Sequence, residues 1–256
     1  MYKKLFSCKN KVVLITGGAG LIGCEIAKGF HDFDATVYIA DKSQDIAKKF
    51  TDHADIRFVS LDISEEKTIK TAVNKIVEDE GRIDVLVNCA YPRTSDWGVK
   101  FEQIPAQSWM ENVNAHLGGY FLGCRIVAEH MKDKGGGSII NFASVYGSVG
   151  PDFSIYEGTS MTMPAAYSAI KGGIISFSKY LATYYAKNNI RVNSLSPGGV
   201  YDNQPKVFVE KYSQKTPLGR MAQPSEIVGG AIYLASDASS YVTGHNLIID
   251  GGWTAW

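Results

Sequence analysis

The sequence lacks a net charge, a long basic run and a long apolar run. Lysine and arginine total 26 and aspartate and glutamate total 26 in 256 residues, so the formal net charge is zero. Without a basic patch, nucleic acid is not expected as a partner. No apolar stretch is long enough to cross a bilayer, and residues 1–10 lack the apolar segment of a signal peptide. We therefore expect a cytoplasmic protein with no membrane or nucleic-acid partner.

Cysteine is scarce, and its positions exclude the usual metal sites. Cys8, Cys24, Cys89 and Cys124 are widely spaced and form no metal-ligand pairs, so no metal is expected. Cys24 and Cys89 fall in segments expected to be buried and are interpreted as small apolar side chains. The 45% hydrophobic and 20% charged content is ordinary for a globular protein, which leaves enough apolar residues for a real core.

Short apolar runs alternate with longer amphipathic stretches along the whole chain. This alternation predicts an α/β fold, namely one domain over residues 1–256 built as a doubly wound, Rossmann-type parallel sheet of about seven strands with helices on both faces. Three irregular stretches, 91–107, 147–164 and 197–223, follow strands at the edge where such sheets bind ligands. The expected strands are 12–16, 36–40, 56–60, 83–87, 138–142, 190–195 and 247–249, and the main expected helices are 21–33, 65–80, 109–132, 165–187 and 224–236.

Tyr167 and Lys171 lie four residues apart in an expected helix, so their side chains share one face. A nearby positive charge favours phenolate over phenol, which makes a tyrosine usable as a proton-transfer group near neutral pH. The spacing alone is weak evidence, because Tyr38 and Lys42 show it in an expected strand. What distinguishes Tyr167 is its place 23 residues after Ser144 and downstream of a glycine-rich turn.

That turn, Thr-Gly-Gly-Ala-Gly-Leu-Ile-Gly at 16–23, joins the first expected strand to a helix. Glycines there let a pyrophosphate approach the helix N-terminus, although a purely structural turn is the alternative. Asp41 ends the second expected strand, 18 residues after Gly23. A carboxylate at that place accepts hydrogen bonds from the adenosine ribose and repels a 2′-phosphate, which favours NAD over NADP. Lys42 weakens this preference, and a helix-capping role for Asp41 is the alternative.

With these residues, the chain resembles the short-chain dehydrogenase/reductase family over residues 12–252. Ser144, Tyr167 and Lys171 match its catalytic serine, tyrosine and lysine. Asn114, in Asn-Val-Asn-Ala-His, matches the helix asparagine that holds a water in a proton relay. The resemblance implies cofactor contacts from Gly17, Gly20, Leu21, Ile22, Gly23, Asp41, Asp62, Ile63, Asn88, Ala90, Tyr167, Lys171, Pro197, Gly198 and Val200.

The resemblance also implies the chemistry. The cofactor supplies hydride transfer to or from a secondary alcohol or ketone. Tyr167 exchanges the hydroxyl proton, Lys171 lowers the pKa of Tyr167, and Ser144 hydrogen-bonds the substrate oxygen. Each residue has a structural alternative, such as a turn-capping role for Ser144. His116 lies two residues past Asn114 and is expected to point away from it as a structural residue.

Departures from the family pattern indicate the substrate. Gly20 and Ser144-Val-Tyr-Gly147 resemble the extended branch that acts on nucleotide sugars, but the chain ends soon after its seventh strand. The stretch 147–164 is interpreted as a substrate-loop insertion, or as a surface loop that packs on itself. Its sequence resembles bacterial oxidoreductases of flagellin and surface-sugar modification, in nonulosonic-acid-type pathways. The residues expected to bind hydroxyl groups are Glu157, Thr159 and Thr162, with Tyr156 or Met161 as an apolar floor.

Three hypotheses remain open from the sequence: an NAD-dependent oxidoreductase acting on a sugar derivative, a nucleotide-sugar epimerase or dehydratase that retains NAD, and a non-catalytic nucleotide-binding subunit. Arg93, Trp97 and Lys100, after the fourth expected strand, face either a substrate or solvent. Trp253 and Trp256 near the carboxyl end favour an interface. By resemblance to the family, a homotetramer or homodimer is expected.

Overall fold

Seven parallel strands form one sheet at the centre of the molecule. A computed structural model describes residues 2–42 and 50–256. The strand order is β3-β2-β1-β4-β5-β6-β7, and each neighbouring pair is parallel, which confirms the predicted fold class. The order reverses between β1 and β4, the kind of switch point at which open α/β sheets bind ligands. The strands are β1 (Val12–Thr16), β2 (Thr36–Asp41), β3 (Arg57–Ser60), β4 (Val85–Asn88), β5 (Gly137–Phe142), β6 (Ile190–Pro197) and β7 (Asn246–Ile249).

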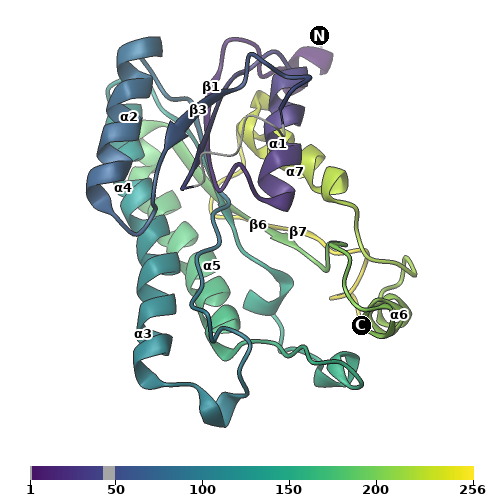
Figure 1. Cartoon of the computed structure of the whole chain (residues 1–256). Coiled ribbons are helices and arrows are strands. Elements are labelled where there is room, and N and C mark those ends of the chain that lie inside the picture. Colours follow the sequence, from purple (N-terminus) through teal and green to yellow (C-terminus); the bar gives the residue numbers. More distant parts are fainter. Residues whose placement is uncertain (1, 43–49) are drawn as a thin grey trace.

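Helices cover both faces of this sheet (Figure 1). Strands β1 and β4 are buried along their whole length, as apolar strands between two helical layers must be. One core cluster lies under α2, α4 and α5, and a second lies under α1 and α7. No helix within the described ranges is long and apolar enough to span a membrane. The main helices are α1 (Leu21–Asp32), α2 (Glu66–Glu80), α3 (Ala106–Val113), α4 (Gly119–Lys132), α5 (Ala165–Tyr185), α6 (Lys206–Lys215) and α7 (Val228–Ala235).

A π-helical turn, η4 (Asn114–Gly118), interrupts the helical column between α3 and α4. The sequence predicts one regular amphipathic helix over 109–132, and the chain is helical throughout that range. A π turn takes more residues per turn than an α-helix. Side chains within the turn therefore leave the 3.6-residue periodicity, and this changes which residue of the segment faces the site described below.

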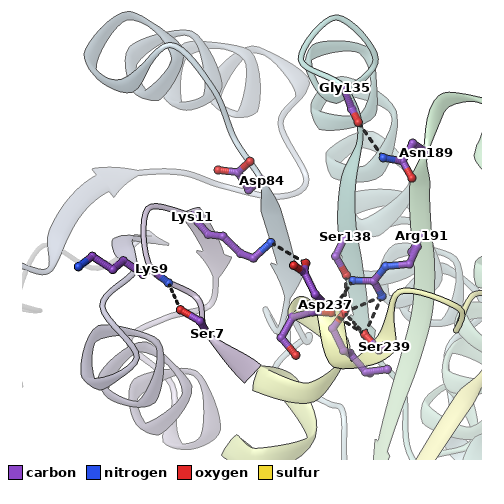
Figure 2. Close-up of polar contacts among 12 residues, drawn as sticks. Ser7, Lys9, Lys11, Asp84, Gly135, Ser138, Asn189, Arg191, Asp237 and Ser239 are labelled. Atoms are coloured by element: carbon purple, nitrogen blue, oxygen red, sulfur yellow. Dashed lines mark hydrogen bonds and ion pairs between the residues drawn. The ribbon is translucent and has the colours of Figure 1, made fainter. Parts of the chain in front are cut away.

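The amino edge of the sheet is closed by polar contacts (Figure 2). The Arg191 guanidinium on β6 donates hydrogen bonds to the backbone oxygens of Leu234 and Ser236, at the carboxyl end of α7. A cation suits these carbonyl groups because the helix dipole is negative there. Lys11 pairs with Asp237 at 3.6 Å and joins the start of β1 to the same region. The opposite, carboxyl edge carries the long loops.

Those loops share a third apolar cluster beyond the carboxyl edge. Short helices and α6 pack together there with the carboxyl-terminal segment, and Trp253 stacks on Tyr212 with ring centres 4.2 Å apart. The cluster therefore gives the long loops a packed core of their own. The short helices of the fold are η1 (Tyr2–Phe6), η3 (Phe101–Gln103), η5 (Val145–Gly147), η6 (Phe153–Tyr156), η7 (Ala186–Asn188), η8 (Pro224–Ile227) and η9 (Asp237–Ser239).

Candidate active site

The structure brings Ser144, Tyr167 and Lys171 together at one cavity. Tyr167 and Lys171 lie one turn apart on α5, and Lys171 Nζ is 5.6 Å from the centre of the Tyr167 ring. Ser144 follows β5 and begins η5, where its Oγ accepts a hydrogen bond from the backbone N–H of Tyr146 at 3.2 Å. Ser144 also lies close enough to Tyr167 for its hydroxyl to lower the pKa of the phenol. The three side chains thus come from the end of β5 and from one face of α5.

Close packing of η5 on α5 fixes this arrangement. A Cβ at Gly147 would lie 2.6 Å from the Lys171 carbonyl carbon, so a side chain there would force η5 away from the helix. Because η5 carries Ser144 at its start, the same contact sets the distance between Ser144 and α5. The glycine of the Ser-Val-Tyr-Gly segment therefore has a positioning role at the site.

Burial dominates the ionisation of Tyr167 and Lys171. Burial raises the pKa of Tyr167, and the hydrogen bond from Ser144 lowers it by a smaller amount. The expectation that Lys171 lowers the pKa of Tyr167 is not met in this arrangement. Lys171 is itself buried, and burial lowers the pKa of its ammonium group to about 7. A lysine that is partly neutral at pH 7 stabilises a phenolate less than a fully charged one.

The Lys171 ammonium group is held from several sides. It donates a hydrogen bond to the Phe142 backbone oxygen at 2.7 Å, which ties α5 to the end of β5. The rings of Tyr91 and Tyr120 also surround it, with their centres 5.9 and 5.7 Å from Nζ. These ring faces attract a cation but accept no proton. These contacts therefore hold the Lys171 ammonium group in place without taking its proton.

The structure corrects the placement expected for Asn114. Asn114 is exposed, whereas His116, two residues further along η4, is fully buried. His116 Nε2 lies 3.5 Å from Lys171 Nζ. Residues two apart on a helix face away from each other, so the turn that directs His116 to Lys171 directs Asn114 to solvent. His116 and Asn114 point away from each other, as predicted, but it is His116 that contacts Lys171 and Asn114 that is exposed.

A cavity of about 540 Å³ adjoins the catalytic side chains. Aromatic and thioether side chains account for eleven of the 28 described residues that line it. Among the described residues that line it, Lys171 is the only cation and Asp202 the only carboxylate. Such a wall suits a ligand with apolar faces and few charges. Its main apolar members include Tyr91, Trp97, Tyr156, Met161, Phe208 and Tyr212.

Only some of the loop residues that were expected to bind substrate line this cavity. Tyr156, Met161 and Thr162 line the cavity. Glu157 instead points to α6, where its carboxylate lies 3.4 Å from Lys211 Nζ. The Thr159 hydroxyl donates a hydrogen bond to the Tyr156 backbone oxygen at 2.7 Å. The roles expected for Glu157 and Thr159 as hydroxyl-binding groups are therefore not supported by their placement.

Two lysines on α6 fix the loop in place. Lys211 Nζ donates hydrogen bonds to the backbone oxygens of Ser154 and Glu157, both at 3.0 Å. Lys215 pairs with Asp152 at 2.7 Å. The loop therefore packs on α6. It is not a surface loop that packs only on itself, which was the alternative interpretation of the sequence. We call the contacts of Lys211 and Lys215 with residues 152–157 the loop clamp.

The glycine turn has the geometry that a dinucleotide needs. Gly17 has φ +69°, and a Cβ there would lie 2.5 Å from the Ala90 Cα atom, so only glycine fits. A Cβ at Gly23 would lie 2.3 Å from the Gly17 oxygen, which brings α1 close to β1. Helix α1 begins after Gly20 without a side-chain cap, so its first N–H groups and positive dipole end suit a pyrophosphate. Leu21 and Ile22 line the cavity, which links this turn to the catalytic residues.

Asp41 and Asp62 lie at the ends of neighbouring strands, beside the glycine turn. The Asp41 carboxylate accepts a hydrogen bond from the Ala19 backbone N–H at 3.2 Å. Lys42 forms an ion pair with Asp62 at 2.6 Å. Burial favours a higher pKa for Asp62, but hydrogen bonds from Lys42 and Ser64 outweigh it and hold the pKa below its usual value. Because Lys42 pairs with Asp62, it is less available to bind the 2′-phosphate of NADP. The presence of Lys42 therefore argues less strongly against a preference for NAD at Asp41.

The other predicted cofactor residues divide into two groups. Pro197, Gly198 and Val200 line the cavity. The Asn88 carboxamide donates to Asn141 Oδ1 at 2.9 Å and to the Cys124 sulfur at 3.3 Å, within the buried sheet. The structure thus places the Asn88 side chain inside the core, where it orders strand ends. Ala90 and Ile63 contribute packing, the first against Gly17 and the second against Gly119.

The loop after β4 adds aromatic walls to the site. The Tyr91 ring meets the Tyr167 ring edge-to-face, with ring centres 5.7 Å apart. Trp97 packs on both, with its ring centre 6.4 Å from that of Tyr167, and it lines the cavity. Arg93 and Lys100 are exposed, and Arg93 lies over the outer face of Tyr91 at 5.4 Å. Of the three residues singled out in this loop, Trp97 is the one placed at the cavity.

His31, Asp32 and His53 form a small cluster at the other end of α1. Asp32 Oδ1 lies 3.6 Å from His31 Nδ1 and 3.9 Å from His53 Nε2, and the two rings pack edge-to-face. These groups are chemically able to bind a metal ion. They lie at the carboxyl end of α1, whereas the cavity adjoins its amino end, so the catalytic geometry does not use them.

Comparison with known proteins agrees with this geometry. The family model described as enoyl-(acyl carrier protein) reductase matches residues 18–254. The chain belongs to the short-chain dehydrogenase/reductase family. Within that family, the chain is 32% identical to post-translational flagellin modification protein A of Campylobacter coli, over 96% of this chain and 98% of that protein.

Two further members of the short-chain dehydrogenase/reductase family extend the comparison. D-threitol dehydrogenase of Mycolicibacterium smegmatis is 32% identical over 97% of this chain and 95% of that protein. The crystal structure of a short-chain dehydrogenase from Leptospira borgpetersenii with bound NAD⁺ superposes with a TM-score of 0.88. It is 39% identical and covers 97% of this chain and 94% of that chain. The family therefore includes oxidoreductases that act on sugar-like alcohols.

Proposed function

We propose that the chain is an NAD-dependent oxidoreductase that interconverts a secondary alcohol and a ketone on a neutral sugar derivative. The observation that carries this proposal is the convergence of Ser144, Tyr167 and Lys171 on a cavity that reaches the glycine turn. Family membership supports the reaction class. The close approach at Gly17 and the uncapped start of α1 suit the pyrophosphate of a dinucleotide.

The residues act on the substrate in defined ways. When bound, the nicotinamide supplies hydride exchange with the substrate carbon. Tyr167 accepts the hydroxyl proton during oxidation and returns it during reduction. Ser144 donates a hydrogen bond to the substrate oxygen, whose negative charge changes during the reaction. Lys171 holds its ammonium group, which is partly charged near pH 7, beside the Tyr167 ring.

The cavity wall supports a neutral, polyhydroxylated substrate. Lys171 is the only cation among the described residues that line it, so a buried phosphate or carboxylate on the substrate would lack a pairing partner away from the catalytic centre. Aromatic faces such as Tyr156 and Phe208 suit the apolar faces of a sugar, and Thr162, Gln204 and Asp202 offer polar groups for its hydroxyls. The flagellin-modification and threitol relatives support a sugar derivative of bacterial surface-glycan metabolism.

The cofactor preference rests on Asp41. Its carboxylate lies beside the glycine turn, at the end of β2, where it suits ribose hydroxyls and repels a 2′-phosphate. The pairing of Lys42 with Asp62 removes the adjacent cation from this role. The NAD⁺ bound in the Leptospira relative is consistent with this preference.

The two alternative hypotheses have less support. A nucleotide-sugar epimerase or dehydratase must hold a diphosphate, and the described cavity wall offers no cation besides Lys171 for it. A non-catalytic subunit has no need for a Ser144 hydroxyl beside the Tyr167 phenol or for the buried Lys171. We also propose a cytoplasmic homo-oligomer, in agreement with four free cysteines and with the exposed aromatic face that Phe121, Tyr180 and Tyr184 form.

A direct experiment combines turnover with cofactor binding. NAD reduction is followed by absorbance with a panel of neutral polyols and sugars, for the wild type and for Tyr167→Phe. We expect the variant to lose about 1,000-fold in kcat while its NAD affinity in a fluorescence titration stays close to that of the wild type. Tyr233→Phe on α7, on the other side of the sheet, is the matched control. Wild-type turnover by Tyr167→Phe would refute the proposed function.

A further inference from the structure

His116 is a buried imidazole in direct contact with the catalytic lysine. It lies within the π turn η4, and its Nε2 atom is 3.5 Å from Lys171 Nζ. Its exposed fraction is 0%. A π turn within an α-helical column is uncommon and is frequently found at functional sites. The turn has a specific consequence here, because it directs His116 rather than Asn114 to the lysine.

The contact with Lys171 determines the state of the imidazole. Burial and the positive charge of Lys171 both hold the pKa of His116 well below its usual value. The ring is therefore neutral, with one protonated nitrogen. A protonated Lys171 is a donor, so the facing Nε2 atom is the acceptor, and the proton of the ring lies on Nδ1.

The Nδ1 atom of His116 is an unsatisfied donor. It is buried and has no hydrogen-bond partner among the described residues. The groups around the ring are aromatic: Tyr91 after β4 and Tyr120 on α4 meet it edge-to-face, with centres 5.4 and 5.2 Å away. The Tyr120 hydroxyl is already bonded to the Ala90 backbone oxygen at 3.2 Å. A buried donor is normally satisfied by an internal water when protein partners are absent.

We infer that His116 is a relay residue, which exchanges a proton with Lys171 at Nε2 and with an internal water at Nδ1. This inference rests on the proposed function, because alcohol oxidation releases one proton that must leave the buried site. The groups lie in the order that a relay needs: the Lys171 ammonium group donates, His116 Nε2 accepts, and His116 Nδ1 donates in turn. The residue acts through Lys171 and does not contact the reacting atoms.

The proton balance of the relay is simple. During oxidation, the Tyr167 phenolate takes the hydroxyl proton from the substrate, Lys171 passes a proton to His116 Nε2, and the Tyr167 hydroxyl returns its proton to the neutral Lys171 amine. The imidazole then releases its Nδ1 proton to the water, so one proton enters the ring and one leaves it. Re-exchange between the two nitrogens restores the starting tautomer. During reduction, each step runs in the opposite direction, and the hydride exchange of the proposed function is unaffected.

The titratable groups around His116 allow this exchange. Lys171 on α5 is the charged group that faces it, and the pKa of the ammonium is lowered to about 7 by burial. Tyr91 and Tyr120 are the other titratable groups in ring contact with it. Burial raises the pKa of both phenols, so they stay protonated and neutral near pH 7. Lys171 is therefore the natural proton donor to the ring.

The first test uses chemical rescue. His116→Ala removes the ring, and we expect kcat to fall about 100-fold while the NAD dissociation constant and the substrate KM stay within about twofold. Added imidazole, which can occupy the space left by the side chain, should restore turnover in a saturable way. The same imidazole concentrations should leave the wild type unchanged. His130→Ala, a second histidine on the same helical column, is the matched control and should retain wild-type turnover.

Asn114 provides a comparison between the two interpretations of this segment. The structure predicts that Asn114→Ala keeps wild-type kcat and pH dependence, because the side chain points to solvent. Loss of turnover in Asn114→Ala with an unchanged His116→Ala would overturn the inference. So would a loss in His116→Ala that imidazole does not restore, in a variant whose melting curve and NAD affinity match those of the wild type.

A second test needs no substitution. The ¹⁵N chemical shifts of His116 in the wild-type protein report which ring nitrogen carries the proton. We expect the neutral form with the proton on Nδ1 from pH 6 to pH 8. The opposite tautomer, or an imidazolium at pH 7, would contradict the relay. This result stands even if His116→Ala fails to fold, and it is distinct from a failure of the proposed function, which appears as absent NAD reduction in the wild type.

Discussion

At the residue scale, burial has the largest effect on the chemistry of the site. Burial raises the pKa of Tyr167 and lowers that of Lys171. The neutral forms of both side chains are therefore more populated near pH 7 than they would be for a tyrosine and a lysine at the surface. The sequence spacing correctly placed the two side chains on one helix face. The spacing could not predict how deeply Tyr167 and Lys171 are buried, because their burial depends on η5 and on the loop after β4. The hydrogen bond from Ser144 is the contact that opposes burial at the phenol.

Removal of the Ser144 hydroxyl should therefore change both rate and pH dependence. Alcohol oxidation needs Tyr167 as phenolate, so its rate rises with pH through the pKa of the phenol. Ser144→Ala removes the bond that lowers this pKa, and the rising limb should move to higher pH. Loss of a hydrogen bond to the charged oxygen should also lower kcat about 100-fold. Ser148→Ala, at the exposed end of η5, is the control in a kcat–pH profile, and an unshifted limb in Ser144→Ala would count against this role.

Asp41 makes a separate prediction on cofactor choice. In the wild type, NAD should bind more tightly than NADP in a fluorescence titration. Asp41→Ala should narrow the ratio of the two dissociation constants by roughly tenfold, about the effect of one hydrogen bond to a charged group. Asp55→Ala, an exposed carboxylate before β3, should leave the ratio unchanged. Tighter binding of NADP by the wild type would contradict the assignment of Asp41.

At the scale of elements, the strands and the main helices follow from the sequence. Apolar runs between polar turns define β1 and β4, because both faces of these strands are buried. The π turn η4 does not follow from the sequence, since a period of 3.6 was assumed across 109–132. The resemblance to the family placed Asn114 at the site, and helix geometry then pointed His116 away from Asn114; in the structure His116 lies at the site and Asn114 is exposed. A single wider turn thus altered one catalytic assignment without altering the fold.

The loop clamp predicts an effect on substrate binding alone. Lys211 donates to the backbone oxygens of Ser154 and Glu157, so Lys211→Met should loosen the loop that carries Tyr156 and Met161 to the cavity. We expect the substrate KM to rise roughly fivefold, in keeping with partly exposed polar contacts. The NAD dissociation constant should not change. Lys206→Met on the same helix, whose ammonium is highly exposed, is the control, and equal KM values in the two variants would refute the clamp.

At the scale of the whole molecule, helices α4 and α5 on one face of the sheet expose aromatic side chains. The outer side of α4 and α5 exposes a row of aromatic rings, with Tyr180 and Tyr184 60% and 61% exposed and stacked on each other. Exposed aromatic groups of this kind are typical of a protein interface. A second copy of the chain is the proposed occupant, because a two-fold axis can pair the same helices of both copies.

Negative charges introduced on this face should disrupt the proposed oligomer. Tyr180→Glu combined with Tyr184→Glu should shift the mass measured by light scattering after size-exclusion chromatography toward that of a monomer. The 27.9 kDa chain makes this shift easy to resolve. Tyr2→Glu, on the exposed η1, is the control and should keep the wild-type mass. A monomeric wild type, or an unchanged mass in the double variant, would contradict the proposed interface.

The central claim is that the convergent side chains carry out hydride exchange between a neutral sugar-type alcohol and NAD. The most direct measurement uses an alcohol substrate with deuterium on the carbon that bears the hydroxyl group. Mass spectrometry then follows the label in the NADH formed during a single turnover. The account predicts transfer of the deuterium to the nicotinamide by the wild type and none by Tyr167→Phe. Product formation with the label retained in the product, and with no net NADH, would contradict it.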